Sequence, residues 1–358
     1  MKSLLLCPEL FARESGIQRI LRLYLKALCE TAGEGDEVRL VVLNDAEFPD
    51  APLRRYANAR LTLRRACGRR KAAFTWQSVR WAAGARRLIC GHIHQLPVAW
   101  IARCLRPQLE YLLVAHGIEV WRPYTWIERL ALRRARRILC VSDYTRTEMR
   151  RRIDLPETRF AVVPNALDPY LVVELTDPPR PAEPVILAVA RLDATEGYKG
   201  VDHLIEALPA VRRTVPAARL RVIGTGSDLP RLRGLASRLG LGGAVEFAGA
   251  VDDETLREAY RACALFALPS RGEGFGIVFL EAMAQGKPCL GARAGAVPEI
   301  VDESSGVLAG YGDVAEIARQ AVWALQHAWN PAEIRRRSAQ FSYPIFAQRL
   351  RETLGNEP

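Results

Sequence analysis

Short, uninterrupted apolar segments alternate with longer amphipathic segments along the first half of the chain. An apolar run without polar alternation is typical of a parallel strand that is buried on both faces. The stretches between them carry apolar residues at helical spacing, as between positions 17 and 28. The pattern predicts strands at residues 3–7, 38–43, 87–93, 111–115, 138–141 and 160–163.

A proline-rich stretch then interrupts this alternation. Six prolines fall between positions 164 and 184. Because proline disfavours helix in the residue before it, the stretch predicts a linker at 169–184. The alternation restarts after it, with strands predicted at 185–190, 220–223, 245–247, 264–268 and 289–291.

Strands and helices that alternate on both sides of a linker predict an α/β protein with two doubly wound, Rossmann-like domains. A length of 358 residues agrees with two domains. We expect the first domain at 1–168 and the second at 185–337, with a C-terminal helix within 338–358 that crosses back to the first. Ligands of such sheets bind outside the carboxyl ends of the strands, so we expect the two domains to face a cleft.

The most informative stretch is PSRGEGFGIVFLE, which runs from Pro269 to Glu281. It follows a predicted strand and leads into a helical segment, so its three glycines stand in a strand-to-helix turn. Glycine lets backbone amides approach a ligand closely, and a helix N-terminus favours an anion by roughly 0.3–1 kcal/mol. The turn predicts a phosphate site at Gly274, Phe275, Gly276 and Ile277.

Two carboxylates, Glu273 and Glu281, bracket this turn. A carboxylate beside a phosphate site would repel the phosphate itself. It is better explained by a neutral ligand group, such as a hydroxyl of ribose or of a sugar. The alternative interpretation is a glycine-rich turn with two ordinary surface acids.

The longer sequence PSRGEGFGIVFLEAMAQGKP, followed by Pro298 and Glu299, closely resembles the E-x7-E signature of the family 4 retaining glycosyltransferases. This resemblance implies the two-domain GT-B fold and a UDP- or GDP-sugar donor. It implies that Glu281 binds ribose hydroxyls and that Glu273 lies beside the donor sugar or phosphate. It also implies same-face transfer, with the leaving phosphate as a candidate base.

Two cations of the second half match the R…K-G pairing of this family. Arg191 follows a predicted strand, and Lys199 opens the next helix. Together they form a cationic clamp suited to a pyrophosphate; two ordinary surface cations are the alternative. The chain contains no D-x-D sequence, so we expect no metal and no other cofactor. The clamp and the helix N-terminus would then neutralise the leaving diphosphate.

Other positions match the family less completely. Gly224 belongs to half of a G-x-G-x-x-G pattern whose third glycine is replaced by Leu229, which makes a nicotinamide dinucleotide site weakly supported. Val251 follows the next strand, where family members hold the nucleobase. Gly16 matches the second glycine of a phosphate-facing G-G loop whose first glycine is Ser15 here; a helix N-cap by Ser15 is the alternative.

Histidines follow two predicted strands of the first half. His116 matches an H-G motif whose histidine lies beside the donor sugar in the family, although a structural role is also open. His92 and His94 form an H-x-H pair without further metal ligands nearby, so we expect them, with Glu119, on the acceptor side. The eight cysteines show no C-x-x-C spacing and indicate reduced thiols of a cytoplasmic protein.

Charge is distributed unevenly between the two halves. The chain carries a net charge of +11, of which residues 1–175 contribute +12 and the remainder −1. Between Asp50 and Glu110 there are 13 lysines and arginines and no acid. Such a basic half indicates an acidic partner: a nucleic acid, an anionic membrane or a phosphorylated substrate.

A helix at 69–88 would separate two faces of this basic stretch. One face would be apolar, and the other would be a solvated strip or a membrane-interface strip. The first comprises Phe74, Trp81, Ala85 and Leu88, and the second Arg69, Trp76, Arg80 and Arg87.

We therefore expect a hexosyltransferase that transfers a sugar to a lipid-linked or polysaccharide-precursor glycan. It would be cytoplasmic and attached peripherally to the inner face of the plasma membrane through Arg54–Arg106. The opening apolar run is too short for a signal peptide, and no run is long enough to span a membrane.

Three alternatives stay open. They are a GT-B nucleotide-sugar epimerase or hydrolase, a nucleotide-binding pseudoenzyme, and a basic nucleic-acid-binding protein. No helix-turn-helix, RNP or zinc signature is present, so a nucleic-acid partner is not expected.

Overall fold

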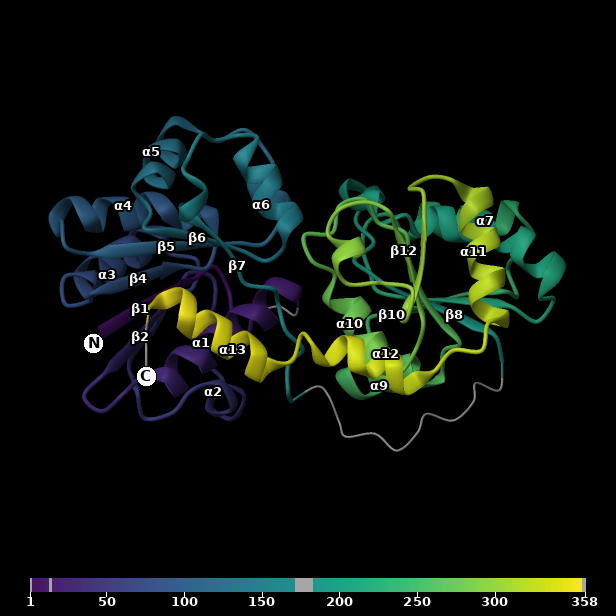
Figure 1. Ribbon diagram of the computed structural model, residues 1–358, viewed down its shortest axis with the longest axis horizontal. Helices are drawn as coiled ribbons and strands as arrows, with labels where there is room; N and C mark the ends of the chain where they lie inside the picture. Colours follow the sequence, from purple (N-terminus) through teal and green to yellow (C-terminus); the bar gives the residue numbers. More distant parts are fainter. Residues whose placement is uncertain (1, 13–14, 171–182, 356–358) are drawn as a thin grey trace. The chain divides into compact units, whose positions relative to one another are not determined.

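The computed structural model describes residues 2–12, 15–170 and 183–355. The chain divides into two units, each built on one parallel sheet (Figure 1). The first unit comprises Met1–Asp168 and Tyr343–Pro358, and the second comprises Pro169–Ser342. Most of the predicted linker, residues 171–182, lies outside the described residues. Among the described residues, no helix has the length and apolar character needed to cross a membrane.

Seven parallel strands form the sheet of the first unit, in the order β3-β2-β1-β4-β5-β6-β7. The strand order reverses between β1 and β4, which is where ligands bind in doubly wound sheets. The strands are β1 (Lys2–Cys7), β2 (Glu37–Val42), β3 (Leu61–Ala66), β4 (Arg87–Cys90), β5 (Glu110–Ala115), β6 (Arg137–Cys140) and β7 (Phe160–Val162).

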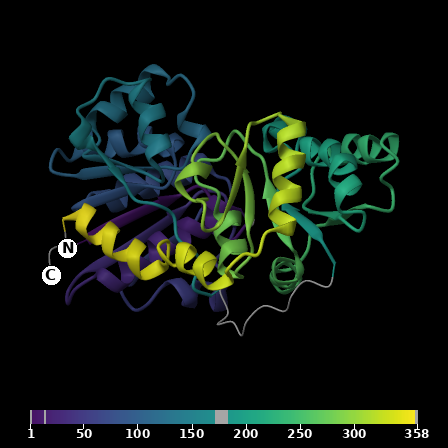
Figure 2. The same cartoon turned by 45° about the vertical axis from the view of Figure 1, so that its right-hand side comes forward.

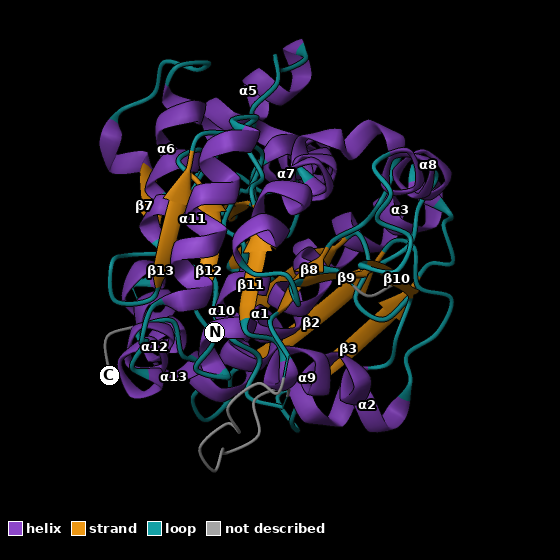
Figure 3. Ribbon diagram, turned by 90° about the vertical axis from the view of Figure 1, so that its right-hand side faces the viewer, coloured by secondary structure: helices purple, strands orange, loops and turns teal. Residues whose placement is uncertain are grey.

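Helices cover both faces of this sheet (Figures 1 and 3). On one face, α1 (Gly16–Thr31) packs against α2 (Asp50–Tyr56) and α13 (Tyr343–Leu354). On the other face, α3 (Lys71–Ala82), α4 (Leu96–Leu105) and α5 (Trp126–Arg134) pack side by side, and α6 (Asp143–Arg150) follows them. Cover on both faces explains why the central strands are continuous apolar runs.

The C-terminal helix α13 belongs to the first unit (Figure 2). Two arginines of the sheet donate hydrogen bonds to the carbonyls at its end. Arg87 of β4 donates to the carbonyl of Leu354, and Arg137 of β6 donates to that of Thr353 at 3.1 Å. The preceding segment forms a separate helix of the second unit, α12 (Pro331–Ala339). The helix that joins the first unit therefore begins at Tyr343.

The predicted helix at 69–88 is wrong in its second half. Helix α3 ends at Ala82, and both Arg87 and Leu88 lie in β4. Since Arg87 is buried, it cannot belong to an exposed strip with Trp76. The sequence pattern also missed β3, because this edge strand is largely exposed and rich in arginine.

Six parallel strands form the sheet of the second unit, in the order β10-β9-β8-β11-β12-β13. Here the order reverses between β8 and β11. The strands are β8 (Val185–Val189), β9 (Arg219–Ile223), β10 (Val245–Gly249), β11 (Leu265–Leu268), β12 (Cys289–Ala292) and β13 (Gly306–Ala309). The covering helices are α7 (Val201–Thr214), α8 (Leu229–Arg238), α9 (Asp253–Ala262), α10 (Ile277–Ala284), α11 (Val314–Gln326) and α12.

Candidate active site

The loops that follow β8 and β11 meet where the strand order of the second sheet reverses. The amide of Arg271 donates to the carbonyl of Tyr198 at 3.1 Å. A Cβ on Gly272 would lie 2.6 Å from the ring of Tyr198, and one on Gly200 would lie 2.5 Å from the carbonyl of Pro269. Glycine is thus required at both contacts, because any side chain would push the loops apart.

An ion pair joins these two loops. The Nζ of Lys199 lies 2.6 Å from Oε1 of Glu273, and their side chains are only 19% and 11% exposed. Burial by itself would lower the pKa of Lys199, but the negative charge of Glu273 and its hydrogen bond outweigh burial, so this pKa lies above its ordinary value. Lys199 is therefore a fixed cation, held in place by a carboxylate.

Arg191 is paired differently. Its side chain is 64% exposed and forms an ion pair with Glu196, which lies in the short 3-10 helix η4 (Ala194–Lys199). The second oxygen of Glu196 is buried and has no hydrogen-bond partner among the described residues. Sequence reasoning missed Glu196, and no pattern in the loop signalled it. Because the Arg191 side chain is largely exposed, solvent screens this pair more than the Lys199–Glu273 pair.

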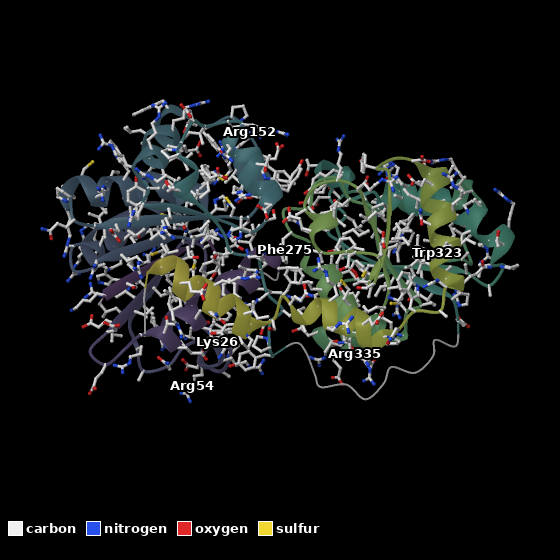
Figure 4. All side chains as sticks on the ribbon, viewed as in Figure 1. Lys26, Arg54, Arg152, Phe275, Trp323 and Arg335 are labelled. Atoms are coloured by element: carbon white, nitrogen blue, oxygen red, sulfur yellow. The ribbon has the colours of Figure 1, made fainter. Side chains whose placement is uncertain are left out.

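The first turn of α10 offers backbone amides next to the Lys199–Glu273 pair. Gly276 precedes the helix with φ of 97°, and no side chain caps the helix. A hydrogen bond fixes the backbone of the preceding turn, since the amide of Ala296 donates to the carbonyl of Glu273 at 3.0 Å. Phe275 (labelled in Figure 4) is buried, with its ring centroid 5.6 Å from that of Phe341. Its side chain thus packs inside the unit, which leaves only its backbone for a ligand.

Glu281 lies in the second turn of α10 and is half-buried. The hydroxyl of Tyr260, from α9, donates to its Oε2 at 2.9 Å. Tyr260 is itself buried, so it orients the carboxylate. Sequence reasoning missed Tyr260, because the contact joins two helices that are separated by a strand.

Packing between two loops requires glycine at position 224. A Cβ there would lie 1.8 Å from the carbonyl of Ala190, so the loops after β8 and β9 could not meet. Gly226 has the same role against Leu192. Val251 follows β10 and is half-buried.

In the first unit, the structure brings the predicted histidines together at the ends of β4 and β5. The Nε2 of His116 lies 2.9 Å from the carbonyl of Gly91, and its backbone amide donates to Glu119 at 2.6 Å. Burial lowers the pKa of His116 to about 4. The ring is therefore neutral near pH 7. Since a carbonyl can only accept, Nε2 carries the proton and Nδ1 carries the lone pair.

The Nδ1 atom of His116 is buried without a partner in the part of the chain that the structure describes. His92 is half-buried, and burial lowers its pKa to about 4 as well. Its Nδ1 accepts the amide of the exposed His94 at 3.3 Å. Among the described residues, no group of three or more His, Cys, Asp or Glu side chains is arranged to hold a metal ion.

Gly16 is the exposed first residue of α1. Ser15 occupies the N-cap position, but its hydroxyl donates to the side chain of Gln18 rather than capping the helix. The start of the β1–α1 loop is held by Asp45, a buried acid that sequence reasoning missed. Its carboxylate accepts the amides of Leu10, Phe11 and Ala12 at 2.9–3.4 Å.

Two protein-family models match the chain. Glycosyltransferase Family 4 matches residues 15–170, and Glycosyl transferases group 1 matches residues 183–327.

Curated relatives match the chain over part of their length. A GDP-mannose-dependent alpha-(1-6)-phosphatidylinositol monomannoside mannosyltransferase of Mycobacterium tuberculosis is 33% identical over 212 residues, which cover 54% of each chain. A D-inositol 3-phosphate glycosyltransferase of Segniliparus rotundus is 38% identical over 133 residues, which cover 36% of this chain and 29% of that protein. The chain thus spans about half the length of the mannosyltransferase.

Among solved structures, Anabaena HepE in complex with UDP and glucose has a TM-score of 0.80. The two proteins are 21% identical, and the match covers 100% of both chains. At this identity, the likeness concerns the fold.

Proposed function

The chain belongs to the group 1 glycosyltransferases of family 4 and has their GT-B fold, and from this premise we propose that it transfers a sugar from a nucleotide-sugar donor to an acceptor hydroxyl. The observation that carries the proposal is the Lys199–Glu273 pair beside the uncapped N-terminus of α10. A cation, a helix N-terminus and a glycine turn at one place suit the diphosphate of such a donor.

The second unit would hold the donor. The diphosphate lies against the first turn of α10, with Lys199 and Arg191 as its cations. Glu281, oriented by Tyr260, accepts hydrogen bonds from the ribose hydroxyls. The nucleobase lies near Val251, a placement that rests on the family resemblance.

The reaction forms one bond and breaks one. The acceptor oxygen bonds to the anomeric carbon on the face from which the diphosphate leaves, so the sugar keeps its configuration. The bond between the anomeric carbon and the diphosphate oxygen breaks, and the acceptor proton passes to an oxygen of the leaving diphosphate. Lys199 and the α10 amides stabilise the charge that develops there, without a metal ion.

Glu273 and His116 would act on the sugar. Glu273 orients Lys199 and accepts a hydrogen bond from a donor hydroxyl. His116 is neutral, so its Nδ1 accepts a hydrogen bond from a substrate hydroxyl. Gly16 adds a phosphate contact, while His92, His94 and Glu119 contact the acceptor.

The acceptor we propose bears a phosphate, as a lipid-linked or polysaccharide-precursor glycan does. Two observations support this class. The first half of the chain carries a net charge of +12. The names of two relatives contain phosphatidylinositol monomannoside and D-inositol 3-phosphate.

A donor screen tests the function. The protein is incubated with UDP- and GDP-hexoses in the presence and absence of a total lipid extract, and the released nucleoside diphosphate is measured. We expect release that depends on the extract, a glycosylated lipid product and no inhibition by a chelator. Lys199→Ala should abolish release, while Arg213→Ala, a change of an exposed cation on α7, should not.

Other outcomes would contradict the proposal. Release without any acceptor would indicate a hydrolase, and conversion of the donor into another nucleotide sugar would indicate an epimerase. Binding of nucleotide without turnover of any donor would indicate a pseudoenzyme. Strong inhibition by a chelator would contradict metal-independent transfer.

A further inference from the structure

The helices α3, α4 and α5 form a layer on one face of the first sheet (Figure 1). Their inward side chains fill the core against the sheet, as Phe74, Leu96 and Leu132 do. The outward side chains of the same helices form what we call the basic aromatic face. Its exposed cations are Lys71, Arg80, Arg129, Arg133 and Arg134, and its exposed apolar side chains are Trp76, Ile101, Leu105 and Trp126.

The apolar side chains of this face are unusually open to solvent. Trp76 is 60% exposed, Leu105 is 72% exposed and Trp126 is 74% exposed. Single exposed apolar residues are ordinary, but four on three adjacent helices indicate an interaction surface. Arg80 lies over the ring of Trp76 at 5.1 Å, so cationic and aromatic groups are interleaved.

Among the described residues, none of these cations forms an ion pair with an acid. Glu128 is the single acidic residue of α3, α4 and α5, all of which the structure describes, and it is buried. Its carboxylate accepts the backbone amide of Thr125 and bridges to Arg122 at 2.6 Å. The outer surface of these helices therefore presents positive charge without exposed acids.

Helices of the second unit have a different surface. The exposed acids Glu206 of α7 and Asp253 and Glu254 of α9 stand among the cations there. The positive charge of the basic aromatic face is thus a local property and does not follow from the composition of the whole chain.

We propose that the basic aromatic face docks the protein on an anionic lipid bilayer. Cations near such a surface are attracted to its headgroups, and tryptophan side chains partition into the headgroup region. Ile101 and Leu105 favour a bilayer over a nucleic acid, because aliphatic side chains gain nothing from a phosphate backbone but are stabilised among acyl chains. The inference does not depend on the transfer reaction.

The structure shifts the membrane strip that the sequence predicted within Arg54–Arg106. Arg87 is removed from it because its guanidinium is buried beneath α13. Helix α5 is added, since it packs beside α4 and exposes Trp126, Arg133 and Arg134.

Vesicle co-sedimentation tests the proposal with the full chain. The probes are phosphatidylcholine vesicles with and without phosphatidylglycerol, at low and at high salt. We expect binding to the anionic vesicles alone, reversed by high salt. The triple variant R80E/R133E/R134E should bind at least about a hundredfold more weakly, because each lost cation removes about a factor of five and each new glutamate adds repulsion.

The matched control is R213E/R238E/R319E, which reverses three exposed cations on helices of the second unit and changes the net charge equally. It should keep wild-type binding to vesicles, and both triple variants should keep wild-type affinity for UDP. Trp76→Ser with Trp126→Ser should weaken vesicle binding about tenfold, since buried apolar area adds to the electrostatic attraction.

Three results would overturn the proposal. One is a wild-type protein that stays unbound to anionic vesicles at low salt. Another is an equal loss of binding in both triple variants, which would assign the effect to net charge. The third is retention by duplex DNA at physiological salt together with unchanged vesicle binding of the tryptophan variant, which would identify a general polyanion surface.

Discussion

The two units share one architecture, but they differ at the edge where the strand order reverses. This edge carries ion pairs in the second unit and neutral histidines in the first. In the second unit, the two candidate donor-site cations are paired with carboxylates: Lys199 with Glu273, and Arg191 with Glu196. In the first unit, the corresponding edge carries His116 and His92, which burial keeps neutral near pH 7.

This difference separates two kinds of recognition. Paired cations stay in place before a ligand arrives, so a diphosphate meets charges that are already oriented. A neutral histidine whose one nitrogen is held by a backbone carbonyl can accept a hydrogen bond from a hydroxyl. The Lys199–Glu273 pair therefore suits a phosphate, whereas the free nitrogen of His116 suits an uncharged hydroxyl.

We expect the largest changes in the kinetic constants when Glu273 and Glu281 are replaced one at a time. Glu273→Ala would leave Lys199 without its partner, and we expect kcat to fall by about 10²–10³, as for a lost preorganised group at a developing charge. Glu281→Ala should mainly raise KM, because ribose contacts form equally in the ground state and in the transition state. Steady-state kinetics on both variants separates the roles, and the reverse pattern would exchange them.

A second test breaks the packing of the first unit. Arg87→Met removes the hydrogen bond to Leu354, and we expect the free energy of unfolding of this unit to fall by about 1.5–3 kcal/mol, the range for a hydrogen bond to a charged group. Hydrogen exchange should accelerate in α13 and stay unchanged in α10. The matched control is Arg80→Met, an exposed change expected within about 0.5 kcal/mol. Equal effects of the two variants would contradict the assigned burial.

Lowering the pH should reduce the free energy of unfolding of the first unit, because His116 is neutral in the folded protein. Its pKa in the folded protein is about 4, below the ordinary value of about 6.5. The unfolded chain therefore binds the proton first as pH falls. The stability from the neutral ring is complete above about pH 6.5 and is lost between there and pH 4, with a slope of up to about 1.4 kcal/mol per pH unit.

Comparing His116→Gln with the wild type isolates this contribution. The variant should be less stable near neutral pH and should lose less stability on acidification, as measured by urea unfolding at each pH. An identical pH dependence of both proteins would contradict the neutral, buried ring.

The smallest expected effect concerns Arg191. Because its side chain is exposed and already paired with Glu196, Arg191→Ala should weaken UDP binding by about 1 kcal/mol or less. Titration calorimetry measures this directly. A loss larger than that of Lys199→Ala would show that the exposed cation is the principal one.

Local patterns in the sequence located the glycine turn and all described strands except β3 and β13, because buried parallel strands are apolar runs and the turn follows one of them. Contacts between distant segments could not be predicted in this way. Glu273 lies 74 residues from Lys199, and Tyr260 lies 21 residues from Glu281. The strand β3 escaped detection because its side chains are mostly exposed, so it lacks the apolar signal of its neighbours.

The end of α3 shows a related limit. Arg87 resembles a surface residue in sequence, yet its aliphatic stem is buried and its guanidinium reaches a helix end contributed by Leu354. Only the fold brings that carbonyl close. Glu273 and Lys199 flank glycines in short motifs, and Glu281 stands at the E-x7-E spacing from Glu273, so the sequence could single out all three as candidates.

The central claim is that Lys199 and the first turn of α10 bind the diphosphate of the donor. Titration calorimetry of UDP and GDP against the wild type, Lys199→Ala and the control Arg213→Ala tests it most directly. We predict that Lys199→Ala loses about 1.5–3 kcal/mol of binding free energy for the nucleotide that the wild type prefers, while the control loses none. Unchanged affinity in Lys199→Ala, with the variant folded as the wild type is, would contradict the claim.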